Sequence, residues 1–283
     1  METAVLNPGA ATAANQIINL LIAQFKPLHI YQFAQLCWQD QCDSIFTAAR
    51  KGNRFVYYLL VITEGSASVE NEIQSFMDRQ NTEDKFVVHA HGEEILRRNL
   101  KACNAYFTSV LNRGVLLYIA NGLVAQGKVQ APNPKRELLR LRAHWHHRSG
   151  MARGFMEAAE QALDNNRDKM CVFLLHHACE QLCVGLIWVN MGYKSDIRNL
   201  QRLLYVCGCF SAEPLMHFMG TQATEVLLHI MMKSFHQARY NDNYNLNGHS
   251  PYRFLELAEG FATLCEGLCK ERFAVMEKGI AAS

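Results

Sequence analysis

The stretch "FLLHHACEQLCVGLIW", from Phe173 to Trp188, decides how the second half of this chain is interpreted. Its apolar residues recur at intervals of three and four, which is the spacing of a helix with one buried face. The pattern predicts a helix over about 169–191 that ends at Gly192. Cys179 belongs to the apolar face and Cys183 lies at its edge, so both cysteines are expected to pack in a core.

The polar residues of this helix allow two interpretations. His176 and Glu180 lie four residues apart and can pair with each other or face a second helix. A metal ion needs several converging ligands, and His176, Cys179 and Cys183 lie roughly along one side. No second cluster with a recognisable ligand spacing occurs elsewhere in the sequence. Packing with a polar edge is therefore favoured, and no metal ligand is predicted.

Composition limits the class of protein. The chain has 283 residues, of which 49% are hydrophobic, and this favours two ordinary domains with real cores. Its formal net charge of +2 gives no general attraction to nucleic acid or to a membrane. Apolar runs such as "FVYYLLVI" (55–62) are too short to cross a bilayer, and the first sixteen residues lack a signal-peptide pattern. We expect a soluble cytoplasmic protein with reduced cysteines and no membrane partner.

The first half alternates strand and helix patterns, which predicts a small mixed α/β domain. Strands are expected at 28–33, 54–63, 84–91 and 114–120, with helices at 64–80 and 92–114. Two glycines, two prolines and little periodicity mark a boundary within 121–136. The predicted domains are therefore 1–130 and 131–283.

Beyond the boundary every pattern is helical, and short loops between helices predict an antiparallel bundle. The predicted helices cover 155–162, 169–191, 197–210, 227–238 and 254–268. The expected fold class is α+β, with a small mixed α/β domain followed by an all-α antiparallel helical bundle. Polar residues of the fourth helix lie near one side and would face His176 and Glu180 if the two helices pack. These residues are Glu225, His229, His236 and Arg239.

Such a seam can hold a phosphate or a base, or it can be a hydrogen-bonded network, which the spacing alone favours. The segment 135–153 is locally basic, with six Lys or Arg side chains against one acid, Glu137. A solvated helix start is the favoured interpretation of that segment, and a phosphate-contacting surface is the alternative.

Two segments of the second half resemble the HEPN domain, a helical bundle found across prokaryotes. They are "CVFLLHHACEQLCVGLIWVNMGYKSDIRNLQRLL" (171–204) and "FHQARYNDNY" (235–244). The family pattern has a helix of the form F-L-L-H-Q-A-x-E, a glycine-bounded turn, an H-N-L helix start, and A-R-Y-x-x-x-Y after a long helix. Here these elements fall on 173–180, Gly192, 198–200, and 238–240 with Tyr244. The resemblance covers roughly 145–275.

The first half resembles the minimal nucleotidyltransferase module that often precedes a HEPN domain, on the segment "VVHAHGEEILRRNLKACNAYFTSVLNRGVLLY" (87–118). Active members carry a Gly-Ser loop where this chain has "YQFAQLC" (31–37), and an Asp-x-Asp where it has Val56 and Tyr58. Two-metal transfer needs carboxylates to hold Mg²⁺. The resemblance therefore implies a scaffold without transferase activity.

Ribonuclease members of the HEPN family use an R-x4–6-H motif. No histidine follows Arg198 within that window, and Arg239 lies ten residues before His249. Arg142 and His147 have the spacing but lie at the start of the first helix of the bundle, where the motif is not expected. Non-nuclease members bind nucleotides or RNA, and many dimerise. The resemblance thus implies a non-catalytic nucleotide- or RNA-binding regulatory protein, a homodimer through the bundle, without a cofactor.

The predicted binding residues come from the two resembling segments. They are His176, Glu180, Arg198, His236, Arg239 and Tyr240. The two arginines are expected to contact phosphate, and the tyrosine to stack or hydrogen-bond. One alternative is a metal-independent endoribonuclease that uses Arg239 with His236 or His229 at an unusual spacing. The other is a structural dimerisation module in which the seam is only a satisfied network.

Overall fold

The computed structural model describes residues 11–44, 47–65, 69–80, 82–121, 123, 127–241 and 243–282. The chain forms two compact units, Met1–Ala131 and Pro132–Ser283. The first contains a mixed sheet with helices and the second is helical, so the expected fold class, α+β, is found.

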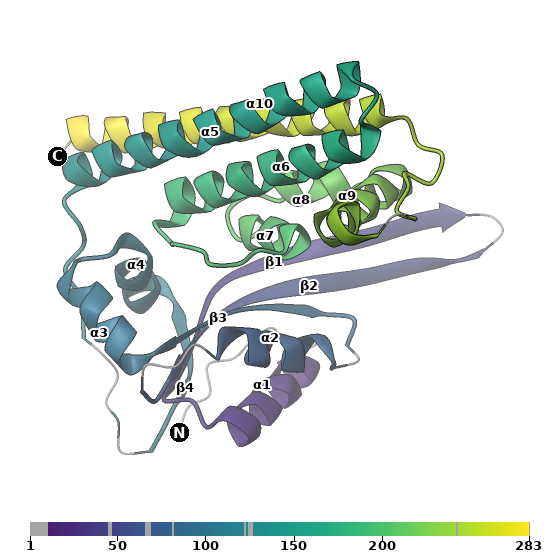
Figure 1. Ribbon diagram of the computed structural model, residues 1–283. Helices are drawn as coiled ribbons and strands as arrows, with labels where there is room; N and C mark the ends of the chain where they lie inside the picture. Colours follow the sequence, from purple (N-terminus) through teal and green to yellow (C-terminus); the bar gives the residue numbers. More distant parts are fainter. Residues whose placement is uncertain are drawn as a thin grey trace. The chain divides into compact units, whose positions relative to one another are not determined.

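The first unit is built on one four-stranded sheet (Figure 1). Its strands are β1 (His29–Ser44), β2 (Thr47–Thr63), β3 (Lys85–Gly92) and β4 (Val115–Ile119), in the order β3-β2-β1-β4. β1 is antiparallel to β2 and β4, whereas β2 and β3 are parallel. The parallel pair needs a crossover, and helix α2 (Glu70–Asp78) lies in that connection.

Helices cover the sheet of the first unit. α1 (Ala11–Phe25) and α2 bury their apolar residues against β1, β2 and β3 in one core cluster. Members of this cluster include Ile17, Leu21, Tyr57, Leu59, Val61, Ile73 and Val88. α3 (Glu93–Lys101) and α4 (Ala105–Arg113) follow β3. Asn104 begins α4 by accepting hydrogen bonds from the backbone N–H groups of Tyr106 and Phe107.

Three features of this unit differ from the sequence predictions. The strands expected at 28–33 and 54–63 are parts of a longer hairpin, because backbone pairing continues where the apolar pattern stops. α1 was not predicted, although Ala14, Ile17 and Leu21 have helical spacing. The single helix expected at 92–114 is two helices, interrupted at Cys103, whose φ of 50° leaves the helical region.

The second unit consists of six helices within the described residues (Figure 1). They are α5 (Pro134–Asp164), α6 (Asp168–Met191), α7 (Leu200–Cys207), α8 (Glu213–Met219), α9 (Gln222–Tyr240) and α10 (Pro251–Ala281). α6 lies at the centre and packs against α5, α7, α9 and α10. Its C-terminus is closed by Gly192 in the left-handed conformation, φ 67°, which glycine adopts without strain.

The apolar composition of α6 has a structural explanation. Among the described residues this helix has the length and hydropathy of a membrane-spanning segment, but 67% of that segment is buried inside the protein. The central helix of a bundle can be as long and as apolar as a membrane-spanning helix, because neighbouring helices surround it. Burial among the other helices is therefore sufficient to account for its apolar residues.

The basic segment 135–153 lies on α5, which is much longer than the helix predicted over 155–162. Arg142 pairs with Glu277 of α10, and its guanidinium lies 5.5 Å from the Phe273 ring. Arg148 Nη1 donates a hydrogen bond to Gln181 Oε1 of α6 at 2.7 Å. These side chains therefore link α5 to its neighbours. Other differences in the bundle are α8, which was not predicted, and α9, which extends to Tyr240. α10 continues to Ala281, well beyond the helix predicted over 254–268, and α7 is shorter than the helix predicted over 197–210.

Candidate functional site

The middle of α6 combines a buried thiol face with a polar edge. Cys179 and Cys183 are fully buried. Burial raises the pKa of the Cys179 thiol to about 12, and burial together with a hydrogen bond to Cys207 raises that of Cys183 well above its usual value. Both thiols are therefore protonated and pack in the core, as their positions in the sequence indicated.

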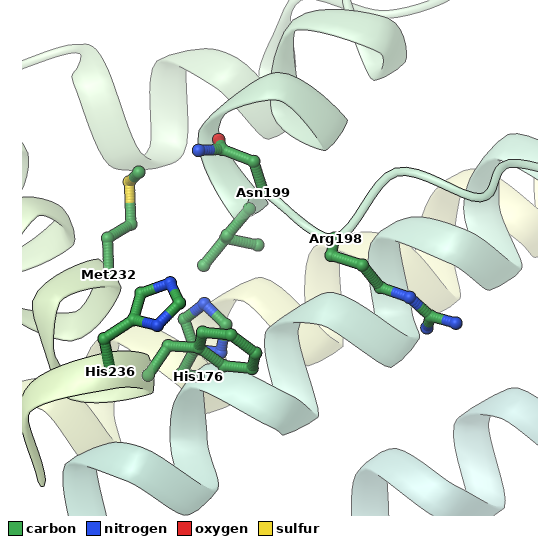
Figure 2. A pocket seen from close by; sticks show the side chains of 7 residues that line it. His176, Arg198, Asn199, Met232 and His236 are labelled. Carbon is green, nitrogen blue, oxygen red and sulfur yellow. The ribbon is translucent and has the colours of Figure 1, made fainter. Parts of the chain in front are cut away.

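A cavity of about 270 Å³ opens beside this polar edge (Figure 2). Its walls come from α6, from the start of α7 and from α9. The lining residues are His176, Arg198, Asn199, Leu200, Met232, Phe235 and His236. The cavity exists because α9 and α7 both pack against α6.

His176 is the most buried polar residue of the cavity, with 2% of its surface exposed. Its ring lies 5.3 Å from the Phe235 ring, and its Nδ1 has no hydrogen-bonding partner among the described residues. Burial, with the neighbouring His177 and His236, lowers the pKa of His176 to about 4 against the opposing effect of Glu180. The imidazole is therefore neutral near pH 7. An unmade hydrogen bond of a buried polar group costs about 1–3 kcal/mol.

Glu180 adjoins the cavity without lining it, and only 4% of its surface is exposed. Its Oε1 lies 3.6 Å from Arg198 Nη1, and its Oε2 lies 3.5 Å from His177 Nδ1. Burial opposes ionisation of Glu180, but the hydrogen bond to His177 and the charges of the two histidines and Arg198 outweigh it. The pKa of Glu180 is consequently lowered, and the group is a carboxylate at neutral pH.

Arg198 reaches the site from the segment that precedes α7. Asn199 accepts a hydrogen bond from the backbone N–H of Arg202 at 2.9 Å and so begins this helix. Arg198 therefore lies directly outside the helix N-terminus. In Figure 2 its guanidinium points away from the rings of His176 and His236, consistent with its contact to Glu180. Its side chain is 76% exposed, so it can change position at little cost.

Arg239 and Tyr240 lie at the end of α9 and do not line the cavity. The Arg239 guanidinium lies 4.8 Å from the Phe235 ring centroid and 5.1 Å from that of Tyr240. Its Nε donates a hydrogen bond to the Phe235 carbonyl at 2.9 Å. Tyr240 is 80% exposed. Phe235 thus lies between the cavity and an exposed Arg–Tyr surface.

The structure brings together only part of the predicted set. His176, Arg198 and His236 line one cavity, and Glu180 is joined to it through Arg198. His229 is exposed and does not line the cavity. Tyr244, the last residue of the A-R-Y-x-x-x-Y pattern, is buried and donates a hydrogen bond to the Ile230 carbonyl at 3.2 Å, so its contact is structural.

The predicted site residues did not include His177, Phe235 or Asn199, although Asn199 was noted as part of the helix start at 198–200. Phe235 was assigned to the core of α9, and the pattern gave no sign that its ring borders a cavity. Asn199 carried a recognisable signal, because an asparagine before an apolar run is a common helix start. His177 also carried a signal, because it lies three residues before Glu180 and side chains at this spacing are neighbours on a helix.

In the first unit, Val56 and Tyr58, which the resemblance aligns with the transferase carboxylates, are both buried. Val56 is 3% and Tyr58 0% exposed. The Tyr58 ring packs 6.1 Å from Phe33, which in turn lies 5.4 Å from His89. Neither Val56 nor Tyr58 supplies the carboxylate oxygens that Mg²⁺ requires.

Comparison with known proteins gives little guidance. No family model matches this chain. No curated protein matches it either. Among solved structures it is similar to a nucleotidyltransferase-like protein from Exiguobacterium sibiricum 255-15, with 13% sequence identity over 93% of this chain and 76% of that chain, and a TM-score of 0.26. A likeness of this strength carries no argument about function.

Proposed function

We propose that this chain is a non-catalytic regulatory protein that binds a nucleotide or RNA through its helical unit. In this proposal the helical unit is a HEPN-like bundle, and the first unit is a degenerate nucleotidyltransferase-like scaffold. The supporting observation is the cavity that His176, Arg198 and His236 line together. It joins aromatic surfaces, hydrogen-bonding groups and a cation in one place.

The lining suits one nucleotide unit. Small-molecule pockets usually measure about 300–1,000 Å³, and this cavity of about 270 Å³ is slightly smaller. In this proposal a base stacks against the Phe235 ring or against an imidazole of the cavity wall, since these rings stack well with π-systems. Arg198 can leave Glu180 and form a charge-assisted contact with a phosphate, because its side chain is mostly exposed.

The surface next to the cavity extends the same chemistry. Arg239 lies among the rings of Phe173, Phe235 and Tyr240. Single-stranded nucleic acid binds to such combinations of aromatic rings and guanidinium groups, by stacking of bases and neutralisation of phosphates. A short single-stranded RNA would place one nucleotide in the cavity and the next against Tyr240.

Two further parts of the proposal follow the resemblance. Val56 and Tyr58 leave the first unit without transferase carboxylates, so it would act as a scaffold. The bundle would form a homodimer.

The second candidate function is a metal-independent endoribonuclease. One observation favours it: His236 and Arg239 are both exposed and lie three residues apart on α9.

Binding is tested with the full chain, a short labelled single-stranded RNA and nucleoside monophosphates. Anisotropy should show binding to the RNA, and thermal unfolding should shift upward with the nucleotides. Arg198→Ala and Arg239→Ala should each weaken RNA binding roughly tenfold, since a hydrogen bond to a charged group contributes about 1.5–3 kcal/mol. Arg253→Ala, an exposed arginine of α10, is the matched control and should change nothing.

Failure of every nucleotide and RNA to bind would contradict the proposal, as would full affinity in both arginine variants. If the wild-type chain instead cleaves the RNA and His236→Ala abolishes cleavage, the protein is the endoribonuclease of the alternative.

A further inference from the structure

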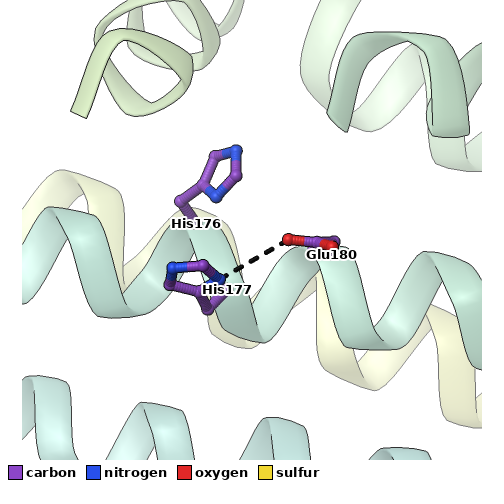
Figure 3. Close-up of side chains that lie close together, drawn as sticks. All are labelled: His176, His177 and Glu180. Carbon is purple, nitrogen blue, oxygen red and sulfur yellow. Dashed lines mark ion pairs between the residues drawn. The ribbon is translucent and has the colours of Figure 1, made fainter. Parts of the chain in front are cut away.

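The polar edge of α6 gathers three metal-binding groups. One ligand atom from each of His176, His177 and Glu180 lies within 4.8 Å of the others (Figure 3). The glutamate is four and three residues after the two histidines, so all three side chains come from neighbouring turns of one helix. Because α6 is the central helix of the bundle, the backbone that carries them is rigidly held.

The orphaned nitrogen of His176 is a second and independent sign of a ligand. Its side chain is almost completely buried, and Nδ1 has no hydrogen-bonding partner among the described residues. Buried polar atoms nearly always have a partner in folded proteins. A metal ion coordinated by this imidazole would satisfy it.

We propose that His176, His177 and Glu180 bind a divalent transition-metal ion of the Zn²⁺ class. Two imidazoles and one carboxylate are a common ligand set for zinc, and three protein ligands leave at least one position open. Bond lengths of about 2.0–2.2 Å place tetrahedral ligands roughly 3.4 Å apart, so binding requires a small inward rotation of the side chains. Because His176 lines the cavity, the open position would be accessible to His236 or to a ligand in the cavity.

The surroundings suit coordination. The His177 ring is held between aromatic rings, 5.4 Å from Phe155, 4.6 Å from Phe173 and 5.6 Å from Phe235. Cys179 and Cys183, the cysteines first considered as ligands, are fully buried on the core face of α6.

Arg198 is the competing cation. It contacts the Glu180 carboxylate at 3.6 Å, where a metal ion would bind. Arg198→Ala removes this positive charge and leaves all three ligands, so it should tighten metal binding. The same substitution should weaken nucleotide or RNA binding under the proposed function. The two proposals therefore predict opposite effects of one variant, and either can fail without the other.

The test uses the chelator-treated full chain titrated with Co²⁺, with Zn²⁺ as competitor. Visible absorption of bound Co²⁺ should appear and saturate stoichiometrically, then disappear when Zn²⁺ displaces it. His177→Phe, which keeps a ring among the aromatic neighbours, and Glu180→Gln should each weaken binding at least tenfold. His229→Phe, at an exposed histidine of α9, is the matched control and should bind as wild type.

Circular dichroism and thermal unfolding of the metal-free variants establish that they are folded. If a ligand variant is unfolded, Arg198→Ala decides the question, since roughly tenfold tighter Co²⁺ binding is expected from removal of the nearby cation. Unchanged or weaker binding in Arg198→Ala would overturn the proposal. So would wild-type affinity in folded His177→Phe and Glu180→Gln, or a thiolate-to-cobalt charge-transfer band, which would assign the ion to cysteines.

Discussion

His144 of α5 shows how one residue makes the bundle sensitive to acid. Its ring lies 4.8 Å from the ring of Trp188 on α6, and its Nε2 is a buried atom without a hydrogen-bonding partner among the described residues. Burial, with the charges of Arg148 and His147, lowers the pKa of His144 to about 4. The folded protein therefore keeps this imidazole neutral at a pH where an unfolded chain would protonate it.

The sign of the pH effect follows from this difference. The pKa of His144 is about 4 in the folded protein, against the ordinary histidine value of 6.5 in an unfolded chain. Between these values the unfolded state binds more protons, so the free energy of unfolding falls as the pH falls. We expect His144→Phe, which keeps a ring against Trp188, to reduce the loss of stability between about pH 7 and about pH 5. The midpoints of urea unfolding at the two pH values, compared between the variant and the wild type, measure this loss of stability.

The matched control is His229→Phe, because His229 is exposed. It should show the wild-type loss of stability. Part of that loss should remain in His144→Phe, since the pKa of His176 is also lowered to about 4. An equal loss in His144→Phe and wild type would show that His144 is not kept neutral by its packing.

Helix packing gives a prediction at the scale of elements. α5 lies close to α6 at Gly185, where an added Cβ would lie 3.0 Å from the Trp145 ring and 3.1 Å from Arg148 Cβ. Glycine inside a helix usually costs about 0.5–1 kcal/mol relative to alanine. Here the absence of a side chain lets the two helices meet.

We therefore expect Gly185→Ala to destabilise the protein, because overpacking costs about 1–3 kcal/mol and outweighs the gain in helix propensity. The control is Gly154→Ala on α5, where an added Cβ would meet nothing within 4 Å. That substitution should stabilise the protein by about 0.5–1 kcal/mol. Chemical denaturation of both variants measures the difference, and equal effects would contradict the close approach.

Elements were predictable wherever local pattern and packing agreed. The strand patterns at 84–91 and 114–120 correspond to β3 and β4, and the pattern at 169–191 to α6. The ends of β1 and β2 could not be predicted from the sequence. Their outer parts have no apolar pattern and are held in the strand conformation by backbone pairing with each other. The break between α3 and α4 depends on one residue, Cys103, with positive φ, which local propensity does not indicate.

At the scale of the whole molecule, each unit has its own core. The cavity residues all belong to the second unit, Pro132–Ser283. We expect a fragment of residues 132–283 to unfold cooperatively and to keep the RNA affinity of the full chain. Its oligomeric state by light scattering should also equal that of the full chain, because the proposed dimer forms through the bundle.

The same fragment tests the role of the first unit. A folded fragment that has lost affinity would show that residues 1–131 contribute directly to binding. A fragment that is monomeric while the full chain is a dimer would place the dimer contact elsewhere. Failure of the fragment to fold cooperatively would contradict the independence of the two cores.

The sequence by itself determined the class of the fold and the helix that carries the polar edge. Periodicity of apolar residues reports which face of an element is buried, and that is a local property. The sequence also placed His176, Arg198 and His236 among the candidate residues. It could not say which of them meet, because they come from α6, the segment before α7, and α9.

Only the tertiary structure decided the site. α7 and α9 pack against α6 in such a way that Phe235, expected in the core, lines the cavity. Arg239 and Tyr240, expected in the site, lie outside the cavity. His177 and Glu180 lie three residues apart on α6, so their contact follows from helix spacing and was already present in the sequence. The physical reason is that the walls of the cavity come from several elements, and the relative positions of those elements are fixed only when the helices pack.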